Sequence, residues 1–93
     1  MYNNIKELRE HINEYGKGSL SKNERYHVVI KNCDIKGIHC VYLKECDKDI
    51  LCLMDSSNSI IARIPYKNIK EIMICNKNFW DVLDTIYYNE GDE

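Results

Sequence analysis

The sequence predicts one α+β domain spanning residues 1–93: an N-terminal helix, a strongly bent five-stranded antiparallel sheet or small barrel, and a C-terminal amphipathic helix. Three observations support this fold class. A chain of 93 residues has the size of a single domain. Apolar side chains recur with a helical period near both ends of the chain and alternate with a period of two between them. Glycine and other turn-forming residues divide the middle of the chain into short segments.

The first predicted helix covers residues 3–15, where apolar side chains are three and four residues apart. Asn4 can cap its first turn, and Glu7, three residues later, completes a capping-box pattern. Gly16 and Gly18 end the helix, because glycine readily adopts the left-handed conformation that follows a helical C-terminus. The side chains expected to face the core are Ile5, Leu8, Ile12 and Tyr15.

The β section covers residues 25–75. Gly37 lies inside its second predicted strand, where a glycine usually marks a bulge or a sharp bend. Pro65 ends the fourth strand because proline cannot donate to a strand ladder. A flat sheet of five strands would expose two long edges, whereas a bend at Gly37 lets the sheet curl into a small barrel. The predicted strands are residues 26–31, 35–45, 50–54, 60–64 and 69–75.

Residues 77–88 are predicted to form the C-terminal helix, capped by Asn76 or Asn78. Trp80 lies off the apolar stripe of this helix, which leaves one large aromatic side chain for a partner or a second subunit. The stripe itself follows the spacing of one helical face and consists of Phe79, Val82, Leu83, Ile86 and Tyr87.

The sequence contains no apolar run near the roughly 20 residues that cross a bilayer. Residues 1–9 lack the apolar stretch of a signal peptide. We therefore expect a cytoplasmic protein without membrane association. Its five cysteines are odd in number and include no Cys-x-x-Cys pair, so reduced thiols are predicted. A metal site built from His39 with Cys40, Cys46 or Cys52 stays open as an alternative.

The net charge of −2 is unevenly distributed, with +2 over residues 1–75 and −4 over residues 76–93. The basic residues form no consecutive block, which argues against a strong duplex-DNA footprint. The acidic C-terminal segment is most simply a solvated surface that aids solubility.

The sequence has no recognisable catalytic or phosphate-binding motif, so it predicts a protein that is not an enzyme and has no cofactor. His11 is expected to face solvent, without a nucleophile pattern beside it. His27 and His39 fall in predicted strands, on the face opposite Tyr26 and Ile38, where they can be cross-strand neighbours. Ordinary strand positions are the favoured interpretation of these two histidines, and binding of a ligand or a base is the alternative.

Two motifs within residues 5–75 resemble those of the Sm-like family. Val28, Ile30 and Asn32, followed by Gly37, are similar to the first Sm motif, in which glycine permits strong curvature. Residues 64–69 (IPYKNI) are similar to the second motif. The resemblance implies an Sm- or SH3-like small barrel that forms a homo-oligomer.

Tyr66 and Lys67 resemble the Tyr-Lys pair of the bacterial Sm-like RNA chaperones, and Asn68 stands where those chaperones have histidine. In that family the lysine lines the pore of a ring and contacts RNA. The resemblance therefore implies binding of single-stranded RNA, by basic side chains and by aromatic rings that stack on bases. The expected nucleic-acid or ligand-binding residues are Tyr66, Lys67, Asn68, Lys31, Lys36 and Arg63.

Seven tyrosines and one tryptophan also favour a protein interface, because these side chains bury apolar area and keep a polar tip. The expected interface residues are Trp80, Tyr87 and Tyr88. Two further functions stay open. One is a phage- or mobile-element-type module or inhibitor that docks on a larger protein. The other is a small-molecule-binding oligomer that uses His27, His39 or Lys67.

Overall fold

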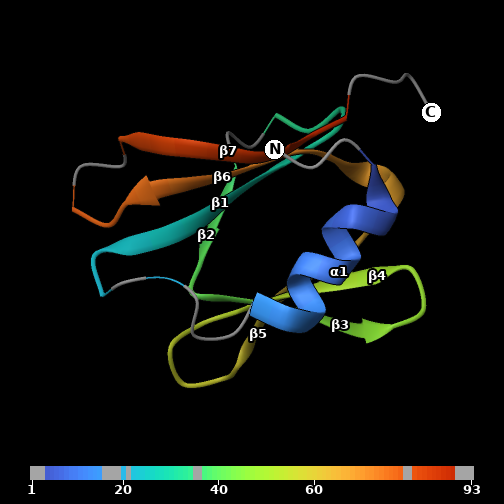
Figure 1. The fold of residues 1–93 in the computed structure, drawn as a ribbon, viewed down its shortest axis with the longest axis horizontal. Coiled ribbons are helices and arrows are strands. Elements are labelled where there is room, and N and C mark those ends of the chain that lie inside the picture. Colours follow the sequence, from blue (N-terminus) through green and yellow to red (C-terminus); the bar gives the residue numbers. More distant parts are fainter. Residues whose placement is uncertain (1–3, 16–19, 21, 35–36, 79–80, 90–93) are drawn as a thin grey trace.

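In a computed structural model, which describes residues 4–15, 20, 22–34, 37–78 and 81–89, the chain forms two antiparallel sheets and one α-helix (Figure 1). The strand order is β2-β1-β6-β7 in the first sheet and β3-β4-β5 in the second. A 3₁₀ turn, η1 (Tyr66–Asn68), connects the second sheet back to the first. None of the helices in the described ranges has the length and apolar character that crossing a membrane requires.

The helix α1 (Ile5–Tyr15) confirms the predicted N-terminal helix and its cap. The Asn4 side-chain oxygen accepts a hydrogen bond of 2.9 Å from the Glu7 backbone N–H, and the Asn4 amide donates to the Glu7 carboxylate at 3.1 Å. The first of these bonds satisfies a backbone donor that the first turn would otherwise leave without a partner, and the second joins the two side chains. Leu8 and Ile12 are buried, so the apolar face of α1 packs on the core as predicted.

The first sheet consists of β1 (Glu24–Ile30), β2 (Ile38–Cys40), β6 (Ile69–Asn76) and β7 (Val82–Tyr88). Along β1, Tyr26 and Val28 are fully buried, whereas the residues that alternate with them are half-buried. This alternation follows the period of two that a strand imposes on its side chains. One face of the sheet therefore joins the core and the other face carries His27.

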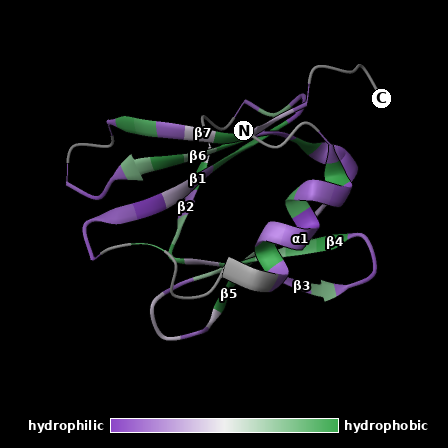
Figure 2. Ribbon diagram, viewed as in Figure 1, coloured by the Kyte–Doolittle hydropathy of each residue, from purple (hydrophilic) through white to green (hydrophobic). Residues whose placement is uncertain are grey.

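The second sheet consists of β3 (Tyr42–Asp47), β4 (Ile50–Met54) and β5 (Ile60–Pro65). Leu51 and Leu53 of its central strand are fully buried. Figure 2 shows the apolar colour concentrated along the strands and on one side of α1. The core formed by α1 and both sheets contains Leu8, Ile12, Tyr26, Val28, Cys40, Leu43, Leu51, Leu53, Ile64, Tyr66, Ile69, Ile72, Ile86 and Tyr87.

Asparagine or aspartate occupies a left-handed position in three of the connections between strands. Asn32, Asp49 and Asn58 have φ values of 53°, 67° and 66°, in the left-handed region that these two residue types tolerate better than most others. Each of the three residues lies between consecutive strands of the chain.

The predicted five-stranded sheet or small barrel is wrong, because the described residues form seven strands in two separate sheets rather than a closed barrel. The chain changes sheet twice, once at Val41 between β2 and β3 and once at η1 between β5 and β6. The predicted strand 35–45 is therefore two short strands in different sheets. Gly37 lies just before β2 instead of bending the middle of a strand. A chain that passes from one sheet to the other at a bend is typical of two sheets that pack on each other.

The predicted C-terminal helix over residues 77–88 is also wrong, because β7 occupies Val82–Tyr88 and pairs with β6. The register shifts between Ile72 and Met73, which leaves Ile86 as an extra residue beside the pair Ile72–Tyr87. This bulge places two consecutive residues, Ile86 and Tyr87, in the core. The spacing of apolar residues that predicted one face of a helix thus belongs to an irregular strand. Phe79 and Trp80 lie outside the described residues.

Candidate metal centre

Two histidines face each other on the first sheet. His27 of β1 and His39 of β2 are directly opposite in the antiparallel register, which confirms that they are cross-strand neighbours. The His27 Nδ1 and the His39 Nε2 lie 3.1 Å apart in a hydrogen bond whose donor depends on the tautomer. The ring centroids are 4.3 Å apart and the rings are inclined by 74°. Both side chains are half-buried.

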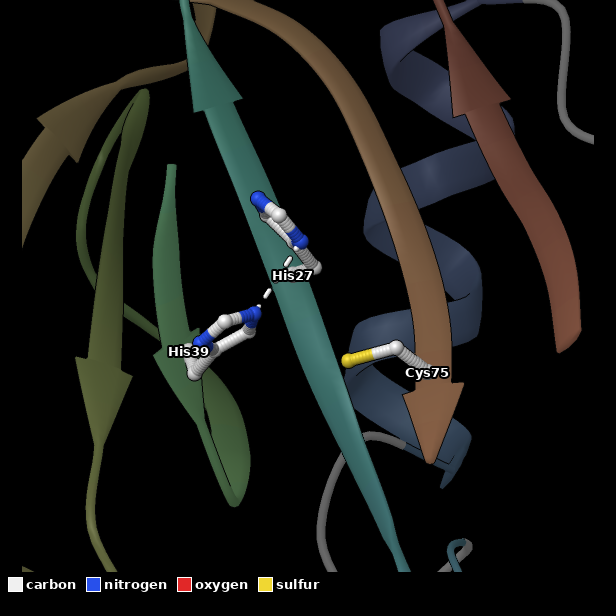
Figure 3. A group of neighbouring side chains, drawn as sticks. All are labelled: His27, His39 and Cys75. Atoms are coloured by element: carbon white, nitrogen blue, oxygen red, sulfur yellow. Dashed lines mark hydrogen bonds between the residues drawn. The ribbon is translucent and has the colours of Figure 1, made fainter. Parts of the chain in front are cut away.

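Cys75 of β6 completes a group of three side chains of the types that can ligate a metal ion. Its backbone is paired with Arg25, two residues before His27, so Cys75 and His27 share one face of the sheet. The two histidine nitrogens and the Cys75 sulfur all lie within 4.8 Å of one another. Figure 3 shows the thiol extending from β6 toward the two rings. Two consecutive strands and a third that is distant in sequence therefore direct one nitrogen or sulfur atom each to the same point.

Gly37 packs directly against the His27 ring. A Cβ at this position would lie 2.1 Å from the His27 Nε2, and the φ of Gly37 is +146°, a value that side chains disfavour. A side chain at this position would therefore displace the His27 imidazole, and only glycine avoids the clash. The glycine that the sequence associates with strand curvature serves here to accommodate a histidine side chain.

The surroundings of His39 favour a neutral ring. Burial lowers the pKa of His39, and the neighbouring His27 lowers it further. Neutral imidazole is the form that ligates metals. Burial raises the pKa of Cys75, against a smaller opposing effect of Arg25. A bound divalent cation would remove the thiol proton, since a coordinating thiol is deprotonated.

The separations suit a tetrahedral zinc ion. Zinc bonds of about 2.0–2.1 Å to nitrogen and about 2.3 Å to sulfur correspond to ligand separations of about 3.4 Å and about 3.6 Å. The histidine nitrogens, at 3.1 Å, already meet this spacing to within a few tenths of an ångström. Since no separation in the group exceeds 4.8 Å, shifts of about 1 Å bring the sulfur into place.

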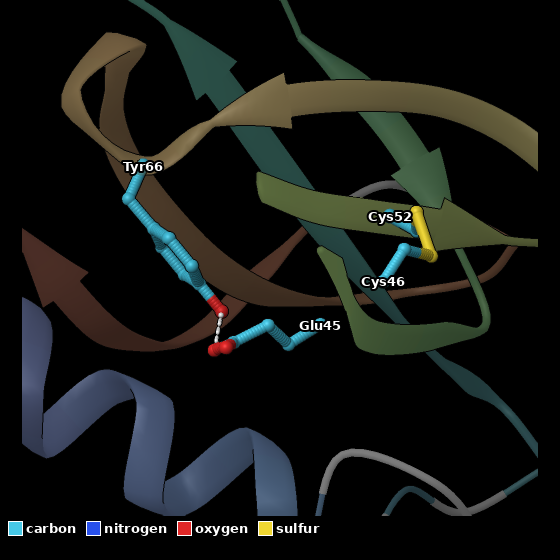
Figure 4. The surroundings of a disulfide bond; sticks show 4 residues. All are labelled: Glu45, Cys46, Cys52 and Tyr66. Carbon is cyan, nitrogen blue, oxygen red and sulfur yellow. Dashed lines mark hydrogen bonds between the residues drawn. A yellow bond between two sulfur atoms is a disulfide. The ribbon is translucent and has the colours of Figure 1, made fainter. Parts of the chain in front are cut away.

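Tyr66, the residue expected to stack on RNA bases, lies in the core with 2% of its surface exposed. Its hydroxyl donates to the Glu45 carboxylate at 3.0 Å (Figure 4). Arg9 of α1 donates to both oxygens of the same carboxylate at 2.7 Å. Burial and the Glu45 hydrogen bond raise the pKa of Tyr66. In this structure the Tyr66 ring connects the helix to the second sheet rather than facing solvent.

The other predicted binding residues are placed as follows. Lys67 and Asn68 are exposed in η1, and the Asn68 carbonyl accepts a hydrogen bond of 2.7 Å from the Lys31 backbone N–H. These three residues are therefore neighbours. Arg63 is exposed on β5, in the other sheet, and Lys36 lies outside the described residues.

Of the predicted interface residues, Tyr87 is buried with 2% exposure and Tyr88 is half-buried. The exposed apolar side chains of β7 are instead Val82 and Leu83, each 54% exposed. The sequence assigned both of these residues to the buried face of a helix. The third predicted interface residue, Trp80, falls in the part of the chain that is not described.

The prediction of five reduced thiols is wrong for two of them, because Cys46 and Cys52 form a disulfide (Figure 4). Cys46 lies at the register shift of the β3–β4 hairpin, and its Cα is 6.0 Å from that of Cys52. Cys33, Cys40 and Cys75 are free thiols. Of the alternative metal-site residues expected from the sequence, Cys46 and Cys52 are thus engaged in the disulfide, and the group that the structure brings together joins His39 with His27 and Cys75.

No protein-family model, curated protein or solved structure matches this chain.

Proposed function

We propose that this protein binds a zinc ion through His27, His39 and Cys75. The observation that carries the proposal is the convergence of two imidazole nitrogens and one thiol within 4.8 Å. Imidazole and thiolate ligands suit zinc, whereas magnesium and calcium prefer oxygen ligands. A site with three protein ligands keeps one coordination position for water or another ligand.

The hydrogen bond between His27 and His39 favours a metal site over a site in which both imidazole rings are protonated and positively charged. With 3.1 Å between the ring nitrogens, one nitrogen has to accept a hydrogen, so the pair excludes two imidazolium ions. A cation can take the place of the shared proton if that proton moves to the other nitrogen of the same ring, which keeps both imidazoles neutral and both rings in nearly the same place. The half-buried position of the pair leaves access for an ion from solvent.

Cobalt(II) substitution tests the proposal, because cobalt occupies zinc sites and a thiolate bond gives it a charge-transfer absorption. We expect one cobalt ion per chain, a thiolate-to-cobalt band, and displacement of the cobalt by zinc. Cys75→Ser should abolish the band, and His27→Ala or His39→Ala should weaken binding at least about tenfold, as is typical for loss of a metal contact.

Cys33→Ser is the matched control, because Cys33 is a free thiol that is exposed. This variant should bind cobalt as the unsubstituted protein does. Circular dichroism of each variant separates loss of a ligand from loss of the fold. A thiolate band that persists in Cys75→Ser, or a protein that takes up no cobalt or zinc, would contradict the proposal.

The homo-oligomer and the RNA or protein partner stay predictions from the sequence. A native mass measured together with the ratio of absorbance at the nucleic-acid and protein maxima reports subunit number and bound nucleic acid at once. Zinc binding at the first sheet is compatible with any of these partners, since Lys31, Lys67 and Asn68 belong to a different group of residues.

A further inference from the structure

A surface pocket of about 240 Å³ borders the histidine pair. His39 lines this pocket as well as the proposed metal site. The other lining residues come from β1, from the end of β2 and the bend after it, and from the loop and strand that follow β4: Arg25, Cys40, Val41, Asp55, Ser56 and Ile61. The pocket and the three metal-binding side chains therefore share one continuous face of the molecule.

Arg25 is held where it can serve both the pocket and the metal site. It lies two residues before His27 on β1, directly opposite Cys75. Its Nη1 donates to the carbonyl oxygens of Lys22 and Glu24 at 3.1 Å and 2.7 Å, which anchors the guanidinium against the backbone. A guanidinium carries five N–H donors, so donors remain for a ligand in the pocket.

We propose that the pocket binds a short-chain monocarboxylate, whose carboxylate occupies the fourth position of the metal ion and pairs with Arg25. This inference rests on the proposed function. A zinc ion with two neutral imidazoles and one thiolate has a charge of +1. Arg25 adds +1, and the charge of Asp55 on the pocket wall subtracts 1. The remaining charge of +1 matches a monoanion better than a dianion such as phosphate.

The Asp55 carboxylate accepts hydrogen bonds within its own turn, so we do not include it among the metal ligands. Its Oδ1 accepts hydrogen bonds of 2.9 Å from the Ser57 and Ser59 backbone N–H groups and of 2.7 Å from the Ser57 hydroxyl. The Ser57 side chain is the largest cause of the lowered pKa of Asp55, followed by the Ser59 backbone. Asp55 therefore contributes a fixed negative charge to the pocket.

The dimensions and walls of the pocket select the rest of the ligand. A volume of about 240 Å³ is below the about 300–1,000 Å³ of sites for drug-sized molecules, so a ligand of few heavy atoms fits. Val41 and Ile61 provide apolar walls, and Ile61 is 46% exposed. A carboxylate with a short aliphatic chain can place its charge at the metal and Arg25 and its methylene groups against these two side chains.

The absorption of the cobalt-loaded, full-length protein tests this inference, because the cobalt d–d bands report a change of the fourth ligand. We expect acetate and butyrate to shift the bands with saturation, and butyrate to bind several-fold tighter through its two additional methylene groups. Phosphate at the same concentration should leave the bands unchanged. Cobalt binding itself reports on the proposed function, so the two claims can fail separately.

Variants of the pocket make the test specific. Arg25→Gln should weaken the apparent carboxylate affinity at least about tenfold, since it removes a charge-assisted pair, and Arg25→Lys should restore part of it. Ile61→Glu adds a negative charge at an exposed position and should weaken carboxylate binding without affecting cobalt uptake. Arg63→Gln is the control, because Arg63 is an exposed arginine that does not line the pocket.

Bands that do not respond to carboxylates while cobalt is bound would overturn the inference and leave the proposed function standing. A response to phosphate alone would overturn the choice of a monocarboxylate. Equal carboxylate affinities for Arg25→Gln, Ile61→Glu and Arg63→Gln would place the ligand outside this pocket. A protein that takes up no cobalt would overturn both claims.

Discussion

At the scale of single residues, the Glu45 carboxylate connects three elements of the fold. Arg9 reaches it from α1 and the Tyr66 hydroxyl reaches it from η1, while Glu45 itself belongs to β3. The Arg9 guanidinium also lies 5.6 Å from the centre of the Tyr66 ring, within the range of a cation–π contact. This carboxylate therefore holds the helix against the second sheet and keeps the tyrosine buried.

Glu45 should make the stability of the protein depend on pH. The Arg9 hydrogen bond is the largest cause that lowers its pKa from the ordinary 4.5, and the Tyr66 hydroxyl lowers it further, against the opposing effect of burial. Because the folded-state pKa lies below the unfolded value, the stabilisation is complete above about pH 5 and is lost as the pH falls through the lowered value.

We expect Glu45→Gln to lower the urea midpoint of unfolding at neutral pH, because it replaces a charged acceptor of Arg9. The difference from the unsubstituted protein should shrink as the pH falls below about 5 and through the lowered pKa of Glu45, because Glu45 is then protonated in the folded state as well as in the unfolded state. Glu10→Gln, at an exposed position of α1, is the control. A difference that stays constant over this pH interval would show that the Glu45 charge contributes nothing.

At the scale of elements, β7 is the part of the molecule where sequence and structure differ most. It lies at one end of the first sheet and, among the described strands, pairs with β6 alone. Its register shifts at two places, and its exposed residues include Asp84. Bulges and charges are features that oppose the pairing of an edge strand with another chain. The exposed Val82 and Leu83 therefore lie on an edge that is protected from simple strand addition.

Two substitutions in β7 distinguish the strand from the helix that the sequence predicts. Leu83 is 54% exposed, so Leu83→Ala should change the free energy of unfolding by less than about 0.5 kcal/mol. Ile86 is 6% exposed, so Ile86→Ala should cost about 2–5 kcal/mol. Urea titration measures both values. In a helix with the predicted stripe the two losses would be similar, and similar losses would count against β7.

At the scale of the whole molecule, the stabilising side-chain network and the proposed metal ligands lie on different sheets. The second sheet, with α1, holds the Arg9–Glu45–Tyr66 network and the disulfide. The first sheet carries the proposed metal ligands on β1, β2 and β6, so only the register of three strands brings them together. An ion at this point would link chain segments far apart in sequence, and the unfolded chain does not hold these ligands in one place.

Zinc should therefore raise the stability of the whole fold. At a free zinc concentration about 100 times the dissociation constant, the free energy of unfolding should increase by about 2.7 kcal/mol, and a chelator should reverse the increase. Thermal unfolding followed by circular dichroism measures the change. Cys75→Ser should lose the response and Cys33→Ser should keep it. An equal response in Cys75→Ser would assign the zinc to other residues.

The sequence by itself determined the features that depend on neighbouring residues. The cap of α1 at Asn4 and Glu7, the turns at Asn32, Asp49 and Asn58, and the alternation along β1 all follow from local chemistry. The same alternation placed His27 and His39 on one face as potential cross-strand neighbours. A local pattern is sufficient here because the partners lie within a few residues, or across a single turn.

Only the tertiary structure decided how the strands are paired. The change of sheet at Val41, the strand conformation of residues 82–88 and the neighbourhood of Cys75 and His27 depend on which segments meet. The apolar spacing over residues 82–87 fits a helix and an irregular strand equally well: the helix would bury Leu83 and Ile86 alike, whereas the strand exposes Leu83 and buries Ile86. Cys75 lies 48 positions after His27, and no local signal specifies a pairing register over that distance. The proposed metal site is therefore a product of long-range strand pairing, whose free energy is shared by the whole core rather than encoded in one segment.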